Sequence, residues 1–166
     1  TQNHAESQAL SLHASNRFYL NELEIEVGVR YEDIEGDLFN YLLNAAKSNK
    51  QAKVLPGVSA LWGLNETTSL FLGVHKGYSP RSPGSSADQA EESTNYEYGL
   101  RFNDENIGFE IVGFHSDYEN LIGRLRVSDF GCNAGEEFSG GEVKISGAEF
   151  SGSFKKSFDN SLDLTI

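Results

Sequence analysis

Hydrophobic and polar residues alternate with a period of two along most of the chain, which is the pattern of β-strands with one apolar face. The first clear run extends from Leu10 to Leu20, and a second follows from Leu23 to Glu32. Asn21 and Glu22 lie between them and are typical of a tight turn. The two runs are therefore predicted to form a long hairpin.

Later runs repeat this plan. They are Val54 to Leu64, Leu70 to Tyr78, Tyr96 to Phe102, Ile107 to Tyr118, Val143 to Phe154 and Leu162 to Ile166. The alternation is lost between residues 35 and 52, where we expect a long loop containing about two turns of helix. The pattern predicts an all-β fold, an antiparallel up-and-down meander of about eight strands that forms a barrel or part of a larger transmembrane β-barrel. Residues 1–166 are expected to form a single domain.

The predicted connections alternate strictly in length. Short turns are expected near residues 21–22, 65–68, 103–106 and 158–160, and long loops at about 35–52, 79–93 and 119–140. All short turns then lie at one end of the sheet, as in outer-membrane barrels. A soluble lipocalin-like barrel also has alternating strands, but nothing requires every second connection in it to be long.

Composition narrows the class of protein further. The formal net charge of −12 argues against a general nucleic-acid binder, which needs clustered Lys and Arg. The single cysteine, Cys132, excludes an intrachain disulfide and a cysteine-based zinc site. We expect no metal site and no cofactor. No signal peptide opens the sequence, which starts without Met, so we expect a mature protein or a piece of a longer one.

Four phrases of the sequence carry a family resemblance. They are NRFYLNELEIEVGVRYEDI, KVLPGVSALWGLNETTSLFLGVHKGYSP, EESTNYEYGLRF and FSGGEVKISGAEF, in this order along the chain. They resemble consecutive barrel strands of TonB-dependent outer-membrane receptors, in particular the branch similar to ferric dicitrate receptors. The resemblance extends from about Leu10 to Phe150, and the order and spacing of the phrases make it specific.

The resemblance implies an internal fragment of a receptor barrel, without the plug domain and without the motif that engages the energy-coupling protein TonB. It implies that the full-length parent lies in the outer membrane of a Gram-negative bacterium and takes up a ferric chelate, such as ferric citrate or a siderophore. Its partners would be the chelate, TonB and outer-membrane lipid, and the fragment alone is not expected to transport. Family members often carry a cysteine pair in the loop that contains Cys132, and Leu125 stands where the first member is expected.

We expect no enzyme activity and no catalytic residues, because no nucleophile, phosphate-binding or paired-carboxylate motif stands out. Arg81, Arg124 and Arg126 lie in predicted long loops and are candidates to bind an anionic chelate, with solvated loop charges as the competing interpretation. Six charged residues share the polar face of their strands and are predicted to form a structural charge ladder facing the lumen: Arg17, Glu26, Arg30, Glu97, Arg101 and Glu110. Trp62, Tyr78, Tyr96 and Tyr98 are candidates for interfacial aromatic girdles.

An alternative reading is a self-contained soluble eight-stranded β-barrel or sandwich, which binds a small ligand or has no activity of its own. An isolated sheet has two exposed edges, and curling would turn its apolar face into a core. This alternative predicts an enclosed apolar cavity and no lipid-facing belt.

Overall fold

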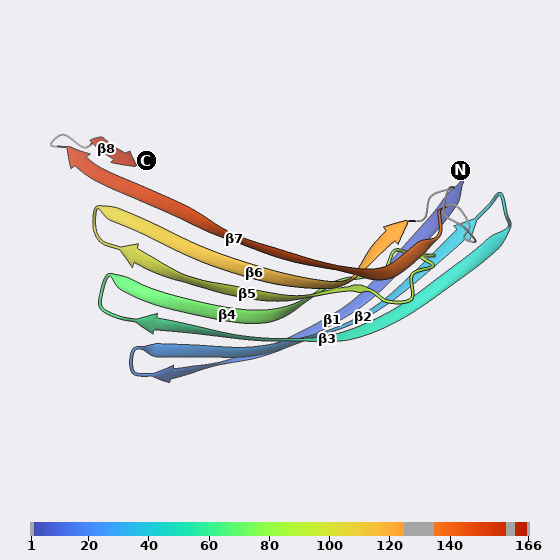
Figure 1. Cartoon of the computed structure of the whole chain (residues 1–166), viewed down its shortest axis with the longest axis horizontal. Helices are drawn as coiled ribbons and strands as arrows, with labels where there is room; N and C mark the ends of the chain where they lie inside the picture. The colour runs from blue at the N-terminus through green and yellow to red at the C-terminus, as the bar shows by residue number, and fades with distance from the viewer. Residues whose placement is uncertain (1, 125–134, 159–161, 166) are drawn as a thin grey trace.

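The computed structural model describes residues 2–124, 135–158 and 162–165. It contains eight strands: β1 (Asn3–Leu20), β2 (Leu23–Asn40), β3 (Ala45–Gly63), β4 (Thr68–Ser79), β5 (Glu91–Asn103), β6 (Ile107–Arg124), β7 (Glu137–Phe158) and β8 (Leu162–Thr165). Each pairs antiparallel with the next along the chain, in the order β1 to β8. The predicted all-β meander is therefore confirmed, and Figure 1 shows it as a curved sheet. The described residues form no helix long and apolar enough to cross a membrane.

The turns at residues 21–22, 64–67 and 104–106 lie at one end of the sheet (Figure 1). The β2–β3 turn of residues 41–44 is also short but lies at the other end, so the predicted strict alternation of short and long connections is wrong. Asn21 adopts a φ of 53°, a left-handed conformation that asparagine tolerates in tight turns. In the next turn the Asn65 side chain accepts hydrogen bonds from the backbone N–H groups of Thr67 and Thr68. The predicted turn at 158–160 falls largely outside the described residues. At the opposite end, which we call the long-loop end, β4 and β5 are joined by residues 80–90.

Between residues 35 and 52 the prediction of a loop with helical turns is wrong. β2 continues to Asn40 and β3 begins at Ala45, with Glu35 opposite Lys50 in an unbroken register. Two local features close the hairpin. The Asn40 side chain accepts hydrogen bonds from the N–H groups of Leu42 and Leu43, and Asn44 has a φ of 46°. These asparagines specify a turn, and pairing with β1 and β3 overrides the helical spacing of the leucines.

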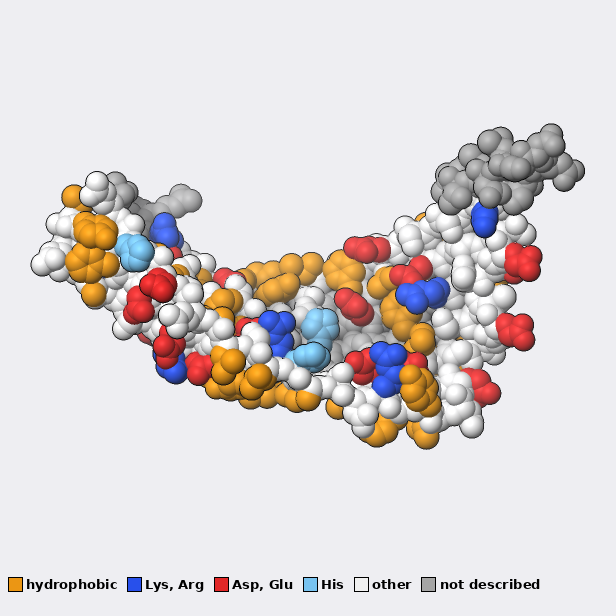
Figure 2. All heavy atoms as spheres, turned by 180° about the vertical axis from the view of Figure 1, so that it is seen from behind, with side chains coloured by type: hydrophobic (Ala, Val, Ile, Leu, Met, Phe, Trp, Pro, Cys, Tyr) orange, Lys and Arg blue, Asp and Glu red, His pale blue; other side chains and the backbone are white. Residues whose placement is uncertain are grey.

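Side chains alternate between two faces of the sheet, and the registers carry this alternation from strand to strand. The apolar face carries hydrophobic rows that include Leu12, Val29, Val58, Leu72, Tyr98, Ile111 and Phe150. The polar face carries most of the charged residues of the middle of the sheet, and Figure 2 shows basic, acidic and histidine side chains gathered in its hollow.

The apolar face is uncovered. Leu72 is 58% exposed and Phe150 is 72% exposed, while the only buried hydrophobic residues in the described part of the chain are Ala87 and Ala90. A water-soluble domain buries such rows in a core. The sheet is open between β1 and β8, so the alternative of a closed soluble barrel or sandwich does not describe this chain.

The two faces exchange character along β2. From Leu23 to Tyr31 the odd-numbered positions belong to the apolar face. Beyond Tyr31 the same row continues as Asp33, Glu35 and Asp37. The opposite row changes from charged residues to Ile34, Gly36 and Leu38. We call residues 33–40 and 45–53, together with residues 3–9 of β1, the extension of the sheet.

Candidate ligand-binding site at the long-loop end

The loop of residues 80–90 is anchored to β3 by side chains. Gln51 is only 8% exposed, and its amide both accepts a hydrogen bond from the Arg81 N–H and donates one to the Arg81 carbonyl, each at 3.1 Å. This pair of bonds imitates the exchange between neighbouring strands. Asn49 donates a further bond to the Ser82 carbonyl at 2.8 Å. The loop therefore lies over the inner row of the extension, where Pro83 approaches Gly36.

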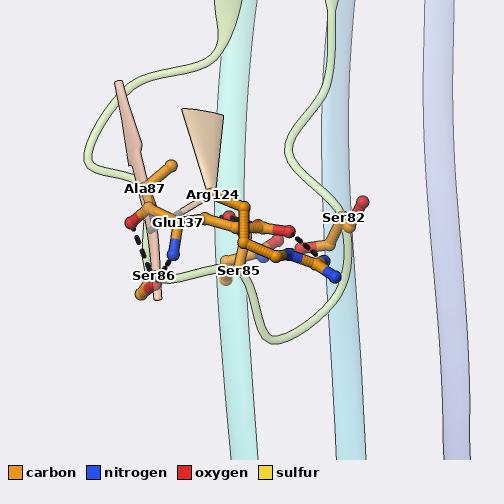
Figure 3. A network of polar contacts seen from close by, with 7 residues as sticks. Ser82, Ser85, Ser86, Ala87, Arg124 and Glu137 are labelled. Atoms are coloured by element: carbon orange, nitrogen blue, oxygen red, sulfur yellow. Dashed lines mark hydrogen bonds and ion pairs between the residues drawn. The ribbon is translucent and has the colours of Figure 1, made fainter. Parts of the chain in front are cut away.

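The same loop is anchored to β6 and β7 on its other side (Figure 3). Ser85 donates a hydrogen bond to the Glu137 carboxylate at 2.6 Å. Ser86 accepts one from the Glu137 N–H at 2.8 Å and donates one to the Glu137 carbonyl at 3.0 Å. Arg124 donates to the second carboxylate oxygen at 2.8 Å. Since the loop bridges β3 and β7 over the polar face, this face is the inside of the curved sheet.

These contacts act on the charge of Glu137. The hydrogen bond from Ser85, and after it the Arg124 guanidinium, hold the pKa of the Glu137 carboxyl below its usual value. The ionised carboxylate is thus the form that supports the bridge.

A cavity of about 660 Å³ lies between the tip of the β2–β3 hairpin, the 80–90 loop and the ends of β6 and β7. We call it the rim cavity. Its wall includes apolar groups from Leu38, Leu43 and Pro83, hydroxyls from Ser82, Ser85 and Ser86, and charged groups from Lys47, Arg124, Glu136 and Glu137. This combination suits a small polar ligand with an apolar body.

The predicted ligand-binding arginines differ in their surroundings. The Arg81 guanidinium donates to the carbonyls of Ala87 at 2.7 Å and Asp88 at 3.2 Å, so its donors hold the loop together. Arg124 lines the rim cavity, is 70% exposed and pairs with Glu137. Arg126 lies outside the described residues, as does Cys132.

All six predicted ladder residues share the polar face. Two cross-strand pairs form within the set, Arg17 with Glu26 at 2.7 Å and Arg101 with Glu110 at 2.5 Å. Arg30 pairs instead with Glu32 on its own strand. Glu97, the sixth residue of the set, lines a separate hollow.

The four aromatic residues predicted to form girdles lie in two different surroundings. Trp62 and Tyr98 are 51% and 56% exposed on the apolar face, and Tyr96 lies on the same face. Tyr78, however, has a buried hydroxyl without a hydrogen-bond partner, so the structure does not place it with the exposed aromatics.

A second hollow, of about 800 Å³, lies on the polar face between β1 and β4. Its lining includes His13, Arg30, Glu32 and His75. No group of three or more potential metal ligands occurs among the described residues. His75 lines this hollow together with the neighbouring Lys76.

Sequence reasoning missed Asn49, Gln51, Lys47 and Glu137 as residues of the site. The first three were assigned to an irregular loop. The available signal lies on the neighbouring strand β2, where Ile34, Gly36 and Leu38 alternate with acidic residues in the opposite phase to the alternation before Tyr31. Nothing in the sequence signals the contact between Glu137 and Ser85, which are far apart along the chain.

An open, strongly curved antiparallel sheet with an uncovered apolar face and an ion-paired polar face defines a section of the wall of a large β-barrel. The family model described as "TonB dependent receptor-like, beta-barrel" matches residues 1–166. The chain therefore belongs to the TonB-dependent receptor-like β-barrel family.

Solved structures agree on the fold. The ferric citrate transporter FecA in its unliganded form superposes with a TM-score of 0.76 at 16% identity, over 92% of this chain and 23% of that chain. The alcaligin outer-membrane receptor FauA from Bordetella pertussis gives 0.75 at 16% identity, over 92% and 28%. The FrpB iron transporter from Neisseria meningitidis gives 0.72 at 16% identity, over 92% and 24%. The chain thus spans about a quarter of the length of these neighbours. A sequence comparison with curated proteins finds no match.

Proposed function

We propose that this chain is a section of the barrel wall of an outer-membrane transporter that takes up ferric chelates with energy supplied through TonB. The observation that carries the proposal is the uncovered apolar face combined with membership of the receptor family. On β1 the apolar row from Leu10 to Leu20 rises about 33 Å at about 3.3 Å per residue. At a strand tilt of about 40° this corresponds to about 25 Å, the height of the apolar band of such barrels.

The orientation follows from the connections. Short turns lie on the periplasmic side of outer-membrane barrels and longer loops outside the cell, so the long-loop end is proposed to be extracellular. The rim cavity then opens where a chelate arrives. Lys47 and Arg124 are proposed to donate hydrogen bonds to the oxygens of the chelate, and Arg81 is proposed to act through the position of the 80–90 loop.

The neighbours support the substrate class by what they transport. Their descriptions name ferric citrate, alcaligin and iron. Because their identity to this chain is low, they support a ferric chelate in general rather than a particular one.

The test is binding of radioactive iron chelates to the complete receptor that carries this chain, purified in detergent. We expect saturable binding of the ferric form, and at least about tenfold weaker binding of the iron-free chelator. Lys47→Gln should weaken binding, while Gln89→Ala should not, because the 80–90 loop uses only the backbone N–H of Gln89. Equal binding of ferric and iron-free forms, or no binding of any ferric chelate, contradicts the proposal.

A further inference from the structure

Three cations of the long-loop end form ion pairs within the described chain: Lys50, on the outward row, and Lys53 and Arg124. Lys50 lies 3.5 Å from the Asp33 carboxylate and 2.5 Å from that of Glu35. Lys53 pairs with Glu92, and Arg124 pairs with Glu137 at 2.8 Å.

Arg81 keeps its positive charge, but its donors are already used within the protein. Its guanidinium is directed at the carbonyls of Ala87 and Asp88, within the body of the loop. Among the described residues of the rim cavity this leaves Lys47 as the basic side chain without an ion pair.

Carboxylates predominate around these cations. Besides Glu136 and Glu137 in the rim cavity, Asp88 lies in the 80–90 loop and Glu91 and Glu92 directly follow it, whereas Asp33, Glu35 and Asp37 lie on the outward row and do not face the cavity. Within the rim cavity itself, Glu136 and Glu137 balance Lys47 and Arg124. A ligand with several negative charges would therefore find no net positive charge in the rim cavity, and the carboxylates beside it would repel the ligand within a Debye length of about 8 Å at physiological ionic strength.

The lining offers other means of recognition. Ser82, Ser85 and Ser86 supply hydroxyl groups, and Leu38, Leu43 and Pro83 supply apolar contact. Such a wall suits a ligand that presents oxygen acceptors and carbon-rich arms without net negative charge.

We propose, resting on the proposed function, that the chelate taken up by this receptor carries no net negative charge, and that it is of the type in which three monoanionic bidentate groups neutralise one ferric ion. Ferric dicitrate, a polyanion, is then a poor ligand. A ferric tris-hydroxamate without further ionised groups has the required charge.

The test compares the two chelates on the complete receptor. Ferric tris-hydroxamate is expected to bind at least about tenfold more tightly than ferric dicitrate, and its affinity is expected to change less than about twofold between low and high salt, because little charge is screened. Tighter binding of ferric dicitrate, or a steep loss of tris-hydroxamate affinity with salt, overturns the inference while the proposed function stands. If neither chelate nor any other ferric chelate binds, the proposed function fails and the inference fails with it.

A variant tests the role of the local charge balance. Glu137→Gln keeps an oxygen that accepts the Ser85 hydrogen bond but leaves Arg124 without its carboxylate. We expect affinity for ferric dicitrate to rise about threefold or more relative to affinity for the uncharged chelate, so the ratio of the two affinities is the measured quantity. Glu142→Gln, at the same end but outside the rim cavity, is the matched control for a general change in charge. Equal gains in the two variants contradict the local effect.

Discussion

The middle of the sheet and its extension are built from the same strands, yet their two faces have opposite character. In the middle, Val29 and Val58 point outward and Arg17 and Glu26 point inward. In the extension the outward row of β2 is acidic, while Leu38 points inward against the 80–90 loop. Since the register is continuous, the backbone does not cause this change.

The difference shows that the surroundings of a strand decide which face is apolar. In the middle of the sheet none of the residues that the structure describes covers the apolar face, and the exposed hydrophobic rows suit lipid. In the extension the acidic outward row suits water, and the loop covers the inside. The boundary at Tyr31 therefore marks the proposed outer limit of the membrane on this wall.

The largest expected effect comes from placing a charge on the middle of the apolar face. Leu72→Arg should destabilise the folded receptor by about 2–4 kcal/mol, because the guanidinium would lie in the apolar band of the membrane. Ser48→Arg lies on the outward row of the extension and should have little effect. Urea-induced unfolding in lipid vesicles measures both. If Ser48→Arg costs as much as Leu72→Arg, the boundary at Tyr31 is misplaced.

A substitution inside the loop should have the next largest effect. Gly84 has a φ of 75°, and a Cβ atom there would lie 2.3 Å from Leu38 Cδ2. Gly84→Ala should destabilise the packing of the loop on the extension by about 2–3 kcal/mol, from backbone strain and overpacking. Hydrogen exchange of residues 80–90 measures this. Gly73→Ala is the control, since its Cβ would meet nothing closer than 3.8 Å. Unchanged exchange in Gly84→Ala would show that the loop does not pack on Leu38.

Removal of the Gln51 amide should have a smaller effect. Gln51→Ala leaves the N–H and carbonyl of Arg81 without their side-chain partner, at an expected cost of about 1–2 kcal/mol. Faster proteolysis within the 80–90 loop is the expected observation. Gln89→Ala should be cleaved at the rate of the unmodified receptor. Equal rates for all three proteins would mean that the bonds to Gln51 do not hold the loop.

The smallest expected effect is a dependence on pH. The pKa of Glu137 is lowered in the folded chain, so its contribution to stability is present above the pKa of an unfolded glutamate, about 4.3, and is lost as pH falls through the lower folded value. Protection of the loop from hydrogen exchange should therefore decrease between about pH 4.3 and lower values. Glu137→Gln should remove this dependence. A dependence that persists in Glu137→Gln would assign it to another group.

The sequence predicts the strands correctly in most of the chain but not between residues 35 and 52. Alternation from Leu10 to Glu32 and from Val54 to Phe102 predicted most of the strands and their apolar face, because a period of two is a local property of an extended backbone. The strand prediction was wrong between residues 35 and 52, because the apolar residues move from the odd-numbered to the even-numbered positions there and the leucines near Asn40 have helical spacing.

What the sequence determined by itself is thus the meander, the apolar rows and the polar ladder from Arg17 to Glu110. Only the tertiary structure decided that the 80–90 loop spans from Gln51 to Glu137 and is held by hydrogen bonds at both sides. Contacts between residues so far apart along the chain depend on the curvature of the sheet, which brings β3 and β7 to the two sides of one loop. No local pattern of residues encodes that curvature.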